Sequence, residues 1–349
     1  MSKKEKGAPL NPHLRFRAAA RPAAGDLFAA LRGGERHRRA LGQAITLLES
    51  TQADDRQLAD ELIDLLEANP PAKPTFRLGI SGTPGVGKST FVESFGLAVA
   101  EAGHRLAVLA IDPSSSLSGG SILGDKTRME ELTRHPNVFI RPSPTGGHLG
   151  GVSANSRAAI LCCEAAGYDY IIVETVGVGQ AEWQVHGMTD AFLLLAQPAA
   201  GDELQSIKRG ILELADHIAV NKADALPEAA KQTALELRRG LHLAPARVDE
   251  WTVSVTTISA LTGKGVTELL DHLSNYADKM RQAGWLTKRR ADQRLTWLRE
   301  RCERELLANL DTFLRERERT TDGLRRILDE HVSLSSATNV ILAEFNKRT

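Results

Sequence analysis

A short glycine-rich loop limits the folds open to this chain more than any other stretch. It fits the pattern G-x-x-x-x-G-K-[ST] and consists of Gly82, Thr83, Pro84, Gly85, Val86, Gly87, Lys88, Ser89 and Thr90. An apolar run precedes it at residues 76–80, and apolar residues at helical spacing follow it at 91–102. The pattern requires a strand, a loop and a helix in this order, so the sequence predicts a phosphate-binding loop.

The residue types of this loop suit a nucleotide. Glycine has no Cβ, so the backbone can turn its N–H groups toward an anion, and the positive end of the following helix adds to the attraction. Lys88 is expected to reach the β- and γ-phosphates, and the Ser89 hydroxyl is expected to bind Mg²⁺. We therefore expect a nucleotide and Mg²⁺ as ligands.

The overall composition argues against several classes of partner. The formal net charge is zero and aromatic residues make up only 5%, so nothing indicates a nucleic acid or a membrane surface. We find no apolar run of about 18 residues, the length of a transmembrane helix. The chain has three cysteines, of which Cys162 and Cys163 are adjacent within a helical pattern, which is typical of buried apolar residues rather than of a disulfide framework. We expect a cytoplasmic protein.

Short apolar runs alternate with helical segments in the middle of the chain. The runs lie at 76–80, 106–111, 138–140, 170–173, 191–195, 217–220 and 253–258. Several are apolar throughout, as in strands that are buried on both faces of a parallel sheet. The alternation predicts an α/β fold with a mostly parallel, doubly wound sheet, in which ligands bind beyond the carboxyl ends of the strands.

Helical extensions are expected on both sides of this region. We expect a disordered tail at 1–22, an N-terminal helical arm at 23–74, a nucleotide-binding domain at 75–280 and a C-terminal helical region at 281–349. Helical patterns occur at 26–31, 37–50 and 54–68, and prolines at 69–74 end the arm. A second set of patterns covers 289–317 and 321–332.

The first C-terminal helix carries an apolar stripe at spacings of three and four. Its members are Leu295, Leu298, Cys302, Leu306, Leu310 and Phe313. Such a stripe either packs on its own domain or forms a dimer surface. We favour the dimer, because a helix pair that projects from the sheet needs a partner.

A guanine-recognition motif follows the strand expected at 217–220. Asn221, Lys222 and Asp224 have the N-K-x-D form, in which the carboxylate can accept from both N1–H and N2–H₂ of guanine. Ser259, Ala260 and Leu261 follow the next strand, where GTPases place a backbone donor toward the guanine O6. GTP rather than ATP is the expected ligand.

Acidic residues follow two other strands. Glu174 ends the run at 170–173 and is expected to order Mg²⁺ or its water shell. Gly177 is expected to donate its N–H to the γ-phosphate, and residues 178–183 to move when that phosphate leaves. Asp112 begins a long loop rich in Gly, Ser, Asp, Lys and Arg. From spacing alone, this loop is equally compatible with a mobile switch and with an ordinary surface loop.

Four stretches of the chain are distinctive when taken together: G-T-P-G-V-G-K-S-T, A-I-D-P-S-S-S-L-S-G-G-S-I-L-G-D-K-T-R-M, R-P-S-P-T-G-G-H-L-G-G-V and V-E-T-V-G-V-G-Q-A-E. They resemble the MeaB/ArgK family of GTPases, to which the methylmalonic aciduria type A protein belongs. The resemblance covers about residues 41–273. It implies a P-loop GTPase of the SIMIBI class that acts as a chaperone of an adenosylcobalamin-dependent acyl-CoA mutase, chiefly methylmalonyl-CoA mutase. Proteins of this family hydrolyse GTP to GDP, and they couple this reaction to the loading and repair of the mutase cofactor. They form homodimers through their C-terminal helices.

The resemblance also implies roles for single residues. It makes Lys88, Asp112, Asp125 and Glu174 catalytic and places Ser89 and the three acidic residues around Mg²⁺. It assigns the switches and the coupling to the mutase to Arg128, Gly177, Gln180, Asp202 and Lys208. The group that orients the attacking water stays open among Gln180, Asp112 and Asp125. We therefore expect hydrolysis that is slow alone and stimulated by the partner.

Two other functions compete with this one. A metallochaperone GTPase that delivers Ni²⁺ or Zn²⁺ needs several soft ligands near the switch loops, where His148 and His186 occur without a cysteine. A kinase acting on a transport protein conflicts with the guanine motif. The sequence contains no Asp-x-His-x-x-Gly cobalamin motif, so we expect cobalamin to stay with the mutase. The sequence does not identify which mutase is served; an adenosyltransferase is a further candidate partner.

Overall fold

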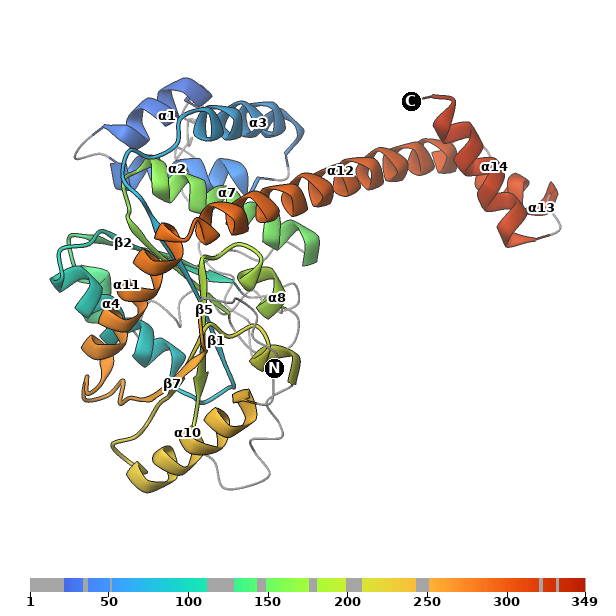
Figure 1. Ribbon diagram of the computed structural model, residues 1–349. Coiled ribbons are helices and arrows are strands. Elements are labelled where there is room, and N and C mark those ends of the chain that lie inside the picture. Colours follow the sequence, from blue (N-terminus) through green and yellow to red (C-terminus); the bar gives the residue numbers. More distant parts are fainter. Residues whose placement is uncertain are drawn as a thin grey trace, which may run out of the picture.

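A seven-stranded sheet in which all strands are parallel forms the centre of the molecule (Figure 1). The computed structural model describes residues 22–33, 37–50, 52–111, 129–142, 149–175, 181–198, 209–242, 251–319, 323–330 and 333–348. The strands are β1 (Phe76–Gly82), β2 (Leu106–Ile111), β3 (Val138–Pro142), β4 (Tyr170–Thr175), β5 (Ala191–Ala196), β6 (His217–Val220) and β7 (Ser254–Thr257). Their order is β3-β2-β4-β1-β5-β6-β7. The predicted α/β fold is confirmed, and each predicted run forms a strand.

Strand β1 lies at the middle of the sheet, between β4 and β5. Phe76 is opposite Tyr170 in β4, and Leu78 is opposite Ala191 in β5. Every residue of β2, β4, β5 and β6 is buried, as expected of parallel strands covered on both faces. Strand β4 is longer than the predicted run, so Glu174 is part of the strand rather than the first residue after it.

Helices cover both faces of the sheet. One face carries α4 (Lys88–Glu101), α6 (Glu130–Arg134) and α11 (Val266–Gln282), whose apolar side chains share a core with Leu78 and Ile80 of β1. The other face carries α7 (Leu149–Ala165), α8 (Ala181–His186), α9 (Arg209–Leu212) and α10 (Pro227–His242).

Three N-terminal helices pack outside α7 (Figure 1). They are α1 (Ala24–Arg32), α2 (His37–Leu48) and α3 (Ala53–Ala68). Leu41 and Ile45 of α2 are fully buried and belong to the same core as Ile171 and Val173 of β4. The leucine pattern of these helices is therefore explained by burial in the core of the sheet domain.

The C-terminal helix α12 (Trp285–Arg319) leaves the sheet domain and projects away from it (Figure 1). Helices α13 (Gly323–Glu330) and α14 (Leu334–Asn346) lie at its far end. The rings of Phe313 and Phe345 meet there edge to face, with centroids 5.7 Å apart. Helix α14 was not predicted from the sequence. Its N-terminus is capped by the Ser333 hydroxyl, which accepts from the Ser336 N–H at 3.2 Å.

None of the helices in the described part of the chain has both the length and the apolar character that a membrane span requires.

Candidate nucleotide-binding site

The predicted phosphate-binding loop joins the carboxyl end of β1 to the first residue of α4. Gly82 ends β1, and a Cβ at this position would lie 2.6 Å from the Leu195 carbonyl oxygen. Gly85 and Gly87 have φ values of 78° and 93°, in the left-handed region that glycine adopts without strain. Three glycines are therefore required by the geometry, one by close packing and two by the backbone turn.

Lys88, at the start of α4, folds back over this loop. Its Nζ donates to the Gly82 carbonyl oxygen at 2.5 Å and lies 3.4 Å from the Thr83 carbonyl oxygen. Burial lowers the pKa of Lys88, while the negative charges of Glu174 and Glu182 act in the opposite direction. Two backbone carbonyl oxygens thus hold the Lys88 ammonium group beside the loop. Phosphate oxygens of a nucleotide could accept hydrogen bonds from the same group.

The end of β4 places a carboxylate next to the loop. Glu174 is 4% exposed and is paired in register with Ile80 of β1. The following residue, Thr175, is fully buried and donates from Oγ1 to the Ser81 hydroxyl at 3.0 Å. This contact joins β4 to β1 immediately before the phosphate-binding loop.

Asn221 connects the phosphate-binding loop to the predicted guanine loops. Its side chain is 2% exposed, and Nδ2 donates to the Val86 carbonyl oxygen at 2.9 Å. Its Oδ1 accepts from the Ala260 N–H, also at 2.9 Å. Three segments that are far apart in the sequence are therefore fixed to one another by a single amide group.

The remaining guanine-motif residues lie around this amide. Lys222 has a φ of 59°, a left-handed conformation that directs the chain away from the end of β6. The hydrogen bond with the Ser259 side chain lowers the pKa of Asp224, so this carboxylate is ionised at neutral pH. Leu261 is 78% exposed and so forms part of the open side of the loop.

The structure thus brings together Lys88, Ser89, Glu174 and the two guanine loops at one edge of the sheet. The other predicted residues of the site lie outside the described part of the chain: Asp112, Asp125, Arg128, Gly177, Gln180, Asp202 and Lys208. Glu182 of α8 was not predicted. Glu182 is 1% exposed, and its charge acts on Lys88. From the sequence, residues 178–183 were expected only to move when the γ-phosphate leaves.

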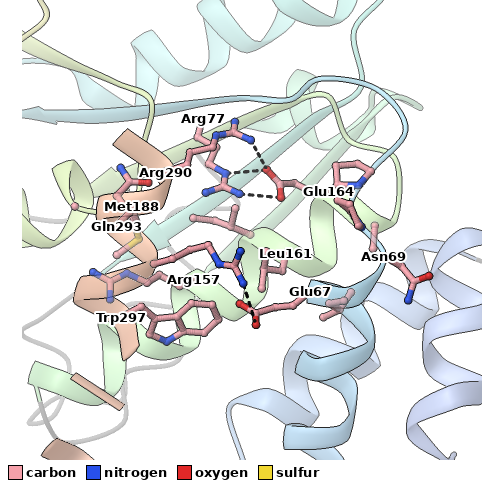
Figure 2. Close-up of a pocket in the computed structure, with 17 residues that line it drawn as sticks. Glu67, Asn69, Arg77, Arg157, Leu161, Glu164, Met188, Arg290, Gln293 and Trp297 are labelled. Atoms are coloured by element: carbon pink, nitrogen blue, oxygen red, sulfur yellow. Dashed lines mark hydrogen bonds and ion pairs between the residues drawn. The ribbon is translucent and has the colours of Figure 1, made fainter. Parts of the chain in front are cut away.

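A separate cavity of about 190 Å³ lies at the opposite edge of the sheet (Figure 2). The end of α3, α7, the turn before β5 and the first turns of α12 line it. Arg77 and Arg290 both point toward Glu164 there, and the Arg77 Nε lies 2.8 Å from Glu164 Oε1. None of the predicted site residues in the described ranges lines this cavity.

The residues considered for a soft metal have other roles. Cys162 and Cys163 are fully buried in the core, and burial raises the pKa of both thiols. The His186 ring packs edge to face against Phe192, with centroids 6.1 Å apart. His148 lies outside the described residues. Within the described ranges, no group of three or more His, Cys, Asp or Glu side chains is arranged to hold a metal ion.

Comparison with known proteins identifies the family. The family model described as "Methylmalonyl Co-A mutase-associated GTPase MeaB" matches residues 41–313, most of the chain. The chain belongs to the MeaB family of GTPases. This match confirms the resemblance that the sequence motifs indicated, and it extends from the N-terminal helices into α12.

Relatives at the level of whole chains agree with this membership. The mitochondrial methylmalonic aciduria type A homolog of Mus musculus is 44% identical over 89% of this chain and 77% of its own. The GTPase ArgK of Escherichia coli is 45% identical over 80% of this chain and 84% of its own. A crystal structure titled LAO/AO transport system kinase is 33% identical, with a TM-score of 0.69 over 93% of this chain and 97% of that one.

Replacement of Asn221 by alanine is expected to weaken both the fold and nucleotide binding. The Val86 carbonyl and the Ala260 N–H would each lose a buried partner, at about 1–3 kcal/mol apiece. Chemical denaturation should show a loss of about 2–6 kcal/mol, and titration with a fluorescent GDP should show weaker binding at temperatures where the variant is folded. Lys231→Ala on the exposed surface of α10 serves as the control. Unchanged affinity in folded Asn221→Ala would show that the amide does not organise the site.

Proposed function

We propose that this protein is a GTPase chaperone that binds and hydrolyses GTP to gate adenosylcobalamin loading, protection and repair of an acyl-CoA mutase. The observation that carries the nucleotide assignment is the Asn221 amide, which holds the phosphate-binding loop and the guanine loops in one rigid arrangement. Membership of a GTPase family supports the same assignment. The description of that family supports methylmalonyl-CoA mutase as the partner.

Different residues of the proposed site bind different parts of GTP. The backbone N–H groups of the loop and the Lys88 ammonium neutralise the phosphates, and Asp224 accepts from the guanine edge. Ser89, Asp112, Asp125 and Glu174 are the residues that would hold Mg²⁺, which when bound stabilises charge on the phosphate oxygens. Glu174 at the end of β4 fits such a cation, because carboxylate oxygens are ligands that Mg²⁺ prefers and this carboxylate lies next to the phosphate-binding loop.

Hydrolysis is proposed to be slow in the isolated protein. Glu174 is not followed by a glutamine placed as in small GTPases, so the residue that orients the attacking water stays open among Gln180, Asp112 and Asp125. A catalytic group or an ordered loop supplied by the mutase would then raise turnover.

The first test is GTP turnover by the purified protein with and without methylmalonyl-CoA mutase, with ATP as the control nucleotide. We expect slow GTP hydrolysis, little with ATP, and a rise well above threefold when the mutase is added, given the far larger effects of groups supplied in trans. If the mutase leaves GTP turnover unchanged, the assignment as a GTPase stands, but the assignment of the mutase as its partner is refuted. Comparable turnover of ATP and GTP would refute the guanine assignment.

Base recognition is tested by the variant Asp224→Asn. Asparagine presents an N–H₂ donor where the carboxylate accepts, which suits the C2 carbonyl of xanthine rather than the N2–H₂ of guanine. The variant should lose at least tenfold in affinity for GDP and gain affinity for xanthosine diphosphate, both measured by calorimetry. GDP affinity equal to that of the wild type would remove Asp224 from the base site.

We also propose that the protein is a homodimer that associates through α12. In the single chain the apolar stripe of this helix is open to solvent, with Leu295 66%, Leu298 60% and Leu306 57% exposed. Phe313 is 5% exposed because α14 covers this end of the stripe. A second copy would cover the remaining apolar surface, which gains about 25 cal/mol per Å² buried.

The variant Leu298→Glu/Leu306→Glu should therefore convert a dimer into a monomer. Two carboxylates in the stripe would have to be desolvated on association, and this cost exceeds the apolar gain. Light scattering coupled to size exclusion measures the mass, and Lys231→Glu on α10 controls for added negative charge. A wild-type protein that is monomeric at micromolar concentration, or a variant that stays dimeric, would contradict this interface.

A further inference from the structure

Helix α8 lies between the candidate nucleotide site and the base of the projecting helix α12. It begins at Ala181, shortly after β4 ends at Thr175 beside the phosphate-binding loop. Glu182, in its first turn, is 1% exposed, and its carboxylate interacts electrostatically with the Lys88 ammonium. The N-terminal end of α8 is therefore in electrostatic contact with the phosphate-binding side of the sheet.

The body of α8 packs closely on β1, the strand that leads into the phosphate-binding loop. Gly79 of β1 has no Cβ, and one built there would lie 2.7 Å from Val185 Cγ1 and 2.8 Å from Thr189 Oγ1. Thr189 is fully buried and donates from Oγ1 to the Val185 carbonyl oxygen at 2.8 Å. Because packed interiors resist compression, a shift of α8 along this strand must move the turn that follows it.

Three residues of α12 hold that turn, from His186 to Asp190. Arg289 Nη2 donates to the His186 carbonyl oxygen at 3.4 Å, and Gln293 Nε2 donates to the Thr189 carbonyl oxygen at 2.8 Å. Arg290 forms a two-point ion pair with Asp190, with distances of 2.8 Å and 2.5 Å. Figure 2 shows Arg290 and Gln293 on α12 near Met188 of the turn.

The ion pair between Arg290 and Asp190 fixes the geometry of this connection. Asp190 is fully buried, which by itself would raise its pKa, but the hydrogen bonds and charge of Arg290 and Arg77 lower it. Removal of one partner of such a buried pair leaves an uncompensated charge, so the pair holds α12 to the turn whatever the state of the site. Arg289 is also paired with the buried carboxylate of Asp216, at 3.4 Å. The hydrogen bond from Gln293 to the Thr189 carbonyl is the neutral contact among these three residues, so it is the most easily changed part of the connection.

A small movement at this base would be amplified along α12. About 40 Å of helix lies beyond Gln293, at 1.5 Å per residue. A tilt of about 10° at the base would then displace the far end by roughly 7 Å. The exposed apolar stripe and helices α13 and α14 lie on this moving part.

We propose that α8 couples the nucleotide state of the phosphate-binding loop to the direction of α12. Glu182 is the positioning residue on the nucleotide side, and Arg289 and Gln293 are the positioning residues on the α12 side. The coupling rests on the proposed binding of GTP at this loop. Coupling is reciprocal, so a change in the α12 contacts must also change the relative affinity of the site for GTP and GDP.

The test measures the distance between two spin labels on the full-length chain. One label is placed at Arg315→Cys, on the face of α12 opposite the stripe, and the other at Lys231→Cys on α10, in a Cys302→Ser background. The buried Cys162 and Cys163 stay unlabelled. Dilution with unlabelled protein leaves only distances within one chain, and samples contain either GDP or a non-hydrolysable GTP analogue.

We expect the mean distance to differ by several ångströms between the two nucleotides. Gln293→Ala removes a single hydrogen bond and should reduce this difference by at least half, as should Glu182→Gln at the other end of α8. Gln293→Ala should also change the ratio of GTP-analogue to GDP affinity about threefold to tenfold, within the usual range of coupling between sites. Arg299→Ala is the matched control, because its partner Glu303 lies on α12 itself, and it should change neither quantity.

Equal distances with both nucleotides in the wild type would overturn the coupling, as would a full difference retained in both variants. Nucleotide binding is measured on the same samples. A protein that binds GTP while α12 keeps one direction refutes the coupling alone, whereas a protein that does not bind GTP refutes the proposed function.

Discussion

All seven strands run in the same direction, and this constraint determines where everything else in the molecule lies. Each strand must be followed by a connection that returns over a face of the sheet, so the segments that begin at the carboxyl ends meet at one edge. The predicted phosphate-binding loop, Glu174 and the two predicted guanine loops meet at this edge. In the sequence they are far apart, from Gly82 to Ala260. Among these polar groups, Glu174 and Asn221 are buried, whereas Lys222 and Asp224 are exposed.

The two edges of the sheet use buried polar groups in different ways. At the carboxyl edge the Asn221 amide satisfies two backbone groups, the Val86 carbonyl and the Ala260 N–H, and so joins two loops. At the opposite edge, Arg77 of β1 is paired with Glu164 of α7, and Arg290 of α12 is paired with Asp190, which immediately precedes β5. Ion pairs of this kind add little net stability, but their geometry is specific, so they determine how a projecting helix is attached.

Prediction of the fold from the sequence was accurate where a short local pattern carries its own physical reason. The glycines of the loop are required by left-handed backbone at Gly85 and Gly87, and a spaced motif reveals such positions directly. The strands were predicted because their apolar runs are bounded by polar residues. Two features were beyond such reasoning. Helix α14 is only partly buried and its pattern is weak, and the electrostatic interaction of Glu182 with Lys88 arises from tertiary packing, which no spacing encodes.

The sequence by itself therefore determined the class of fold, the family and the position of the phosphate-binding and guanine motifs, because each of these depends on residues that are close together in the chain. The tertiary structure alone decided that one amide joins those motifs, that the N-terminal leucines complete the core of the sheet domain, and that Arg289, Arg290 and Gln293 hold the turn after α8. The physical reason is that these contacts join segments that only the packing of the sheet brings within hydrogen-bonding distance.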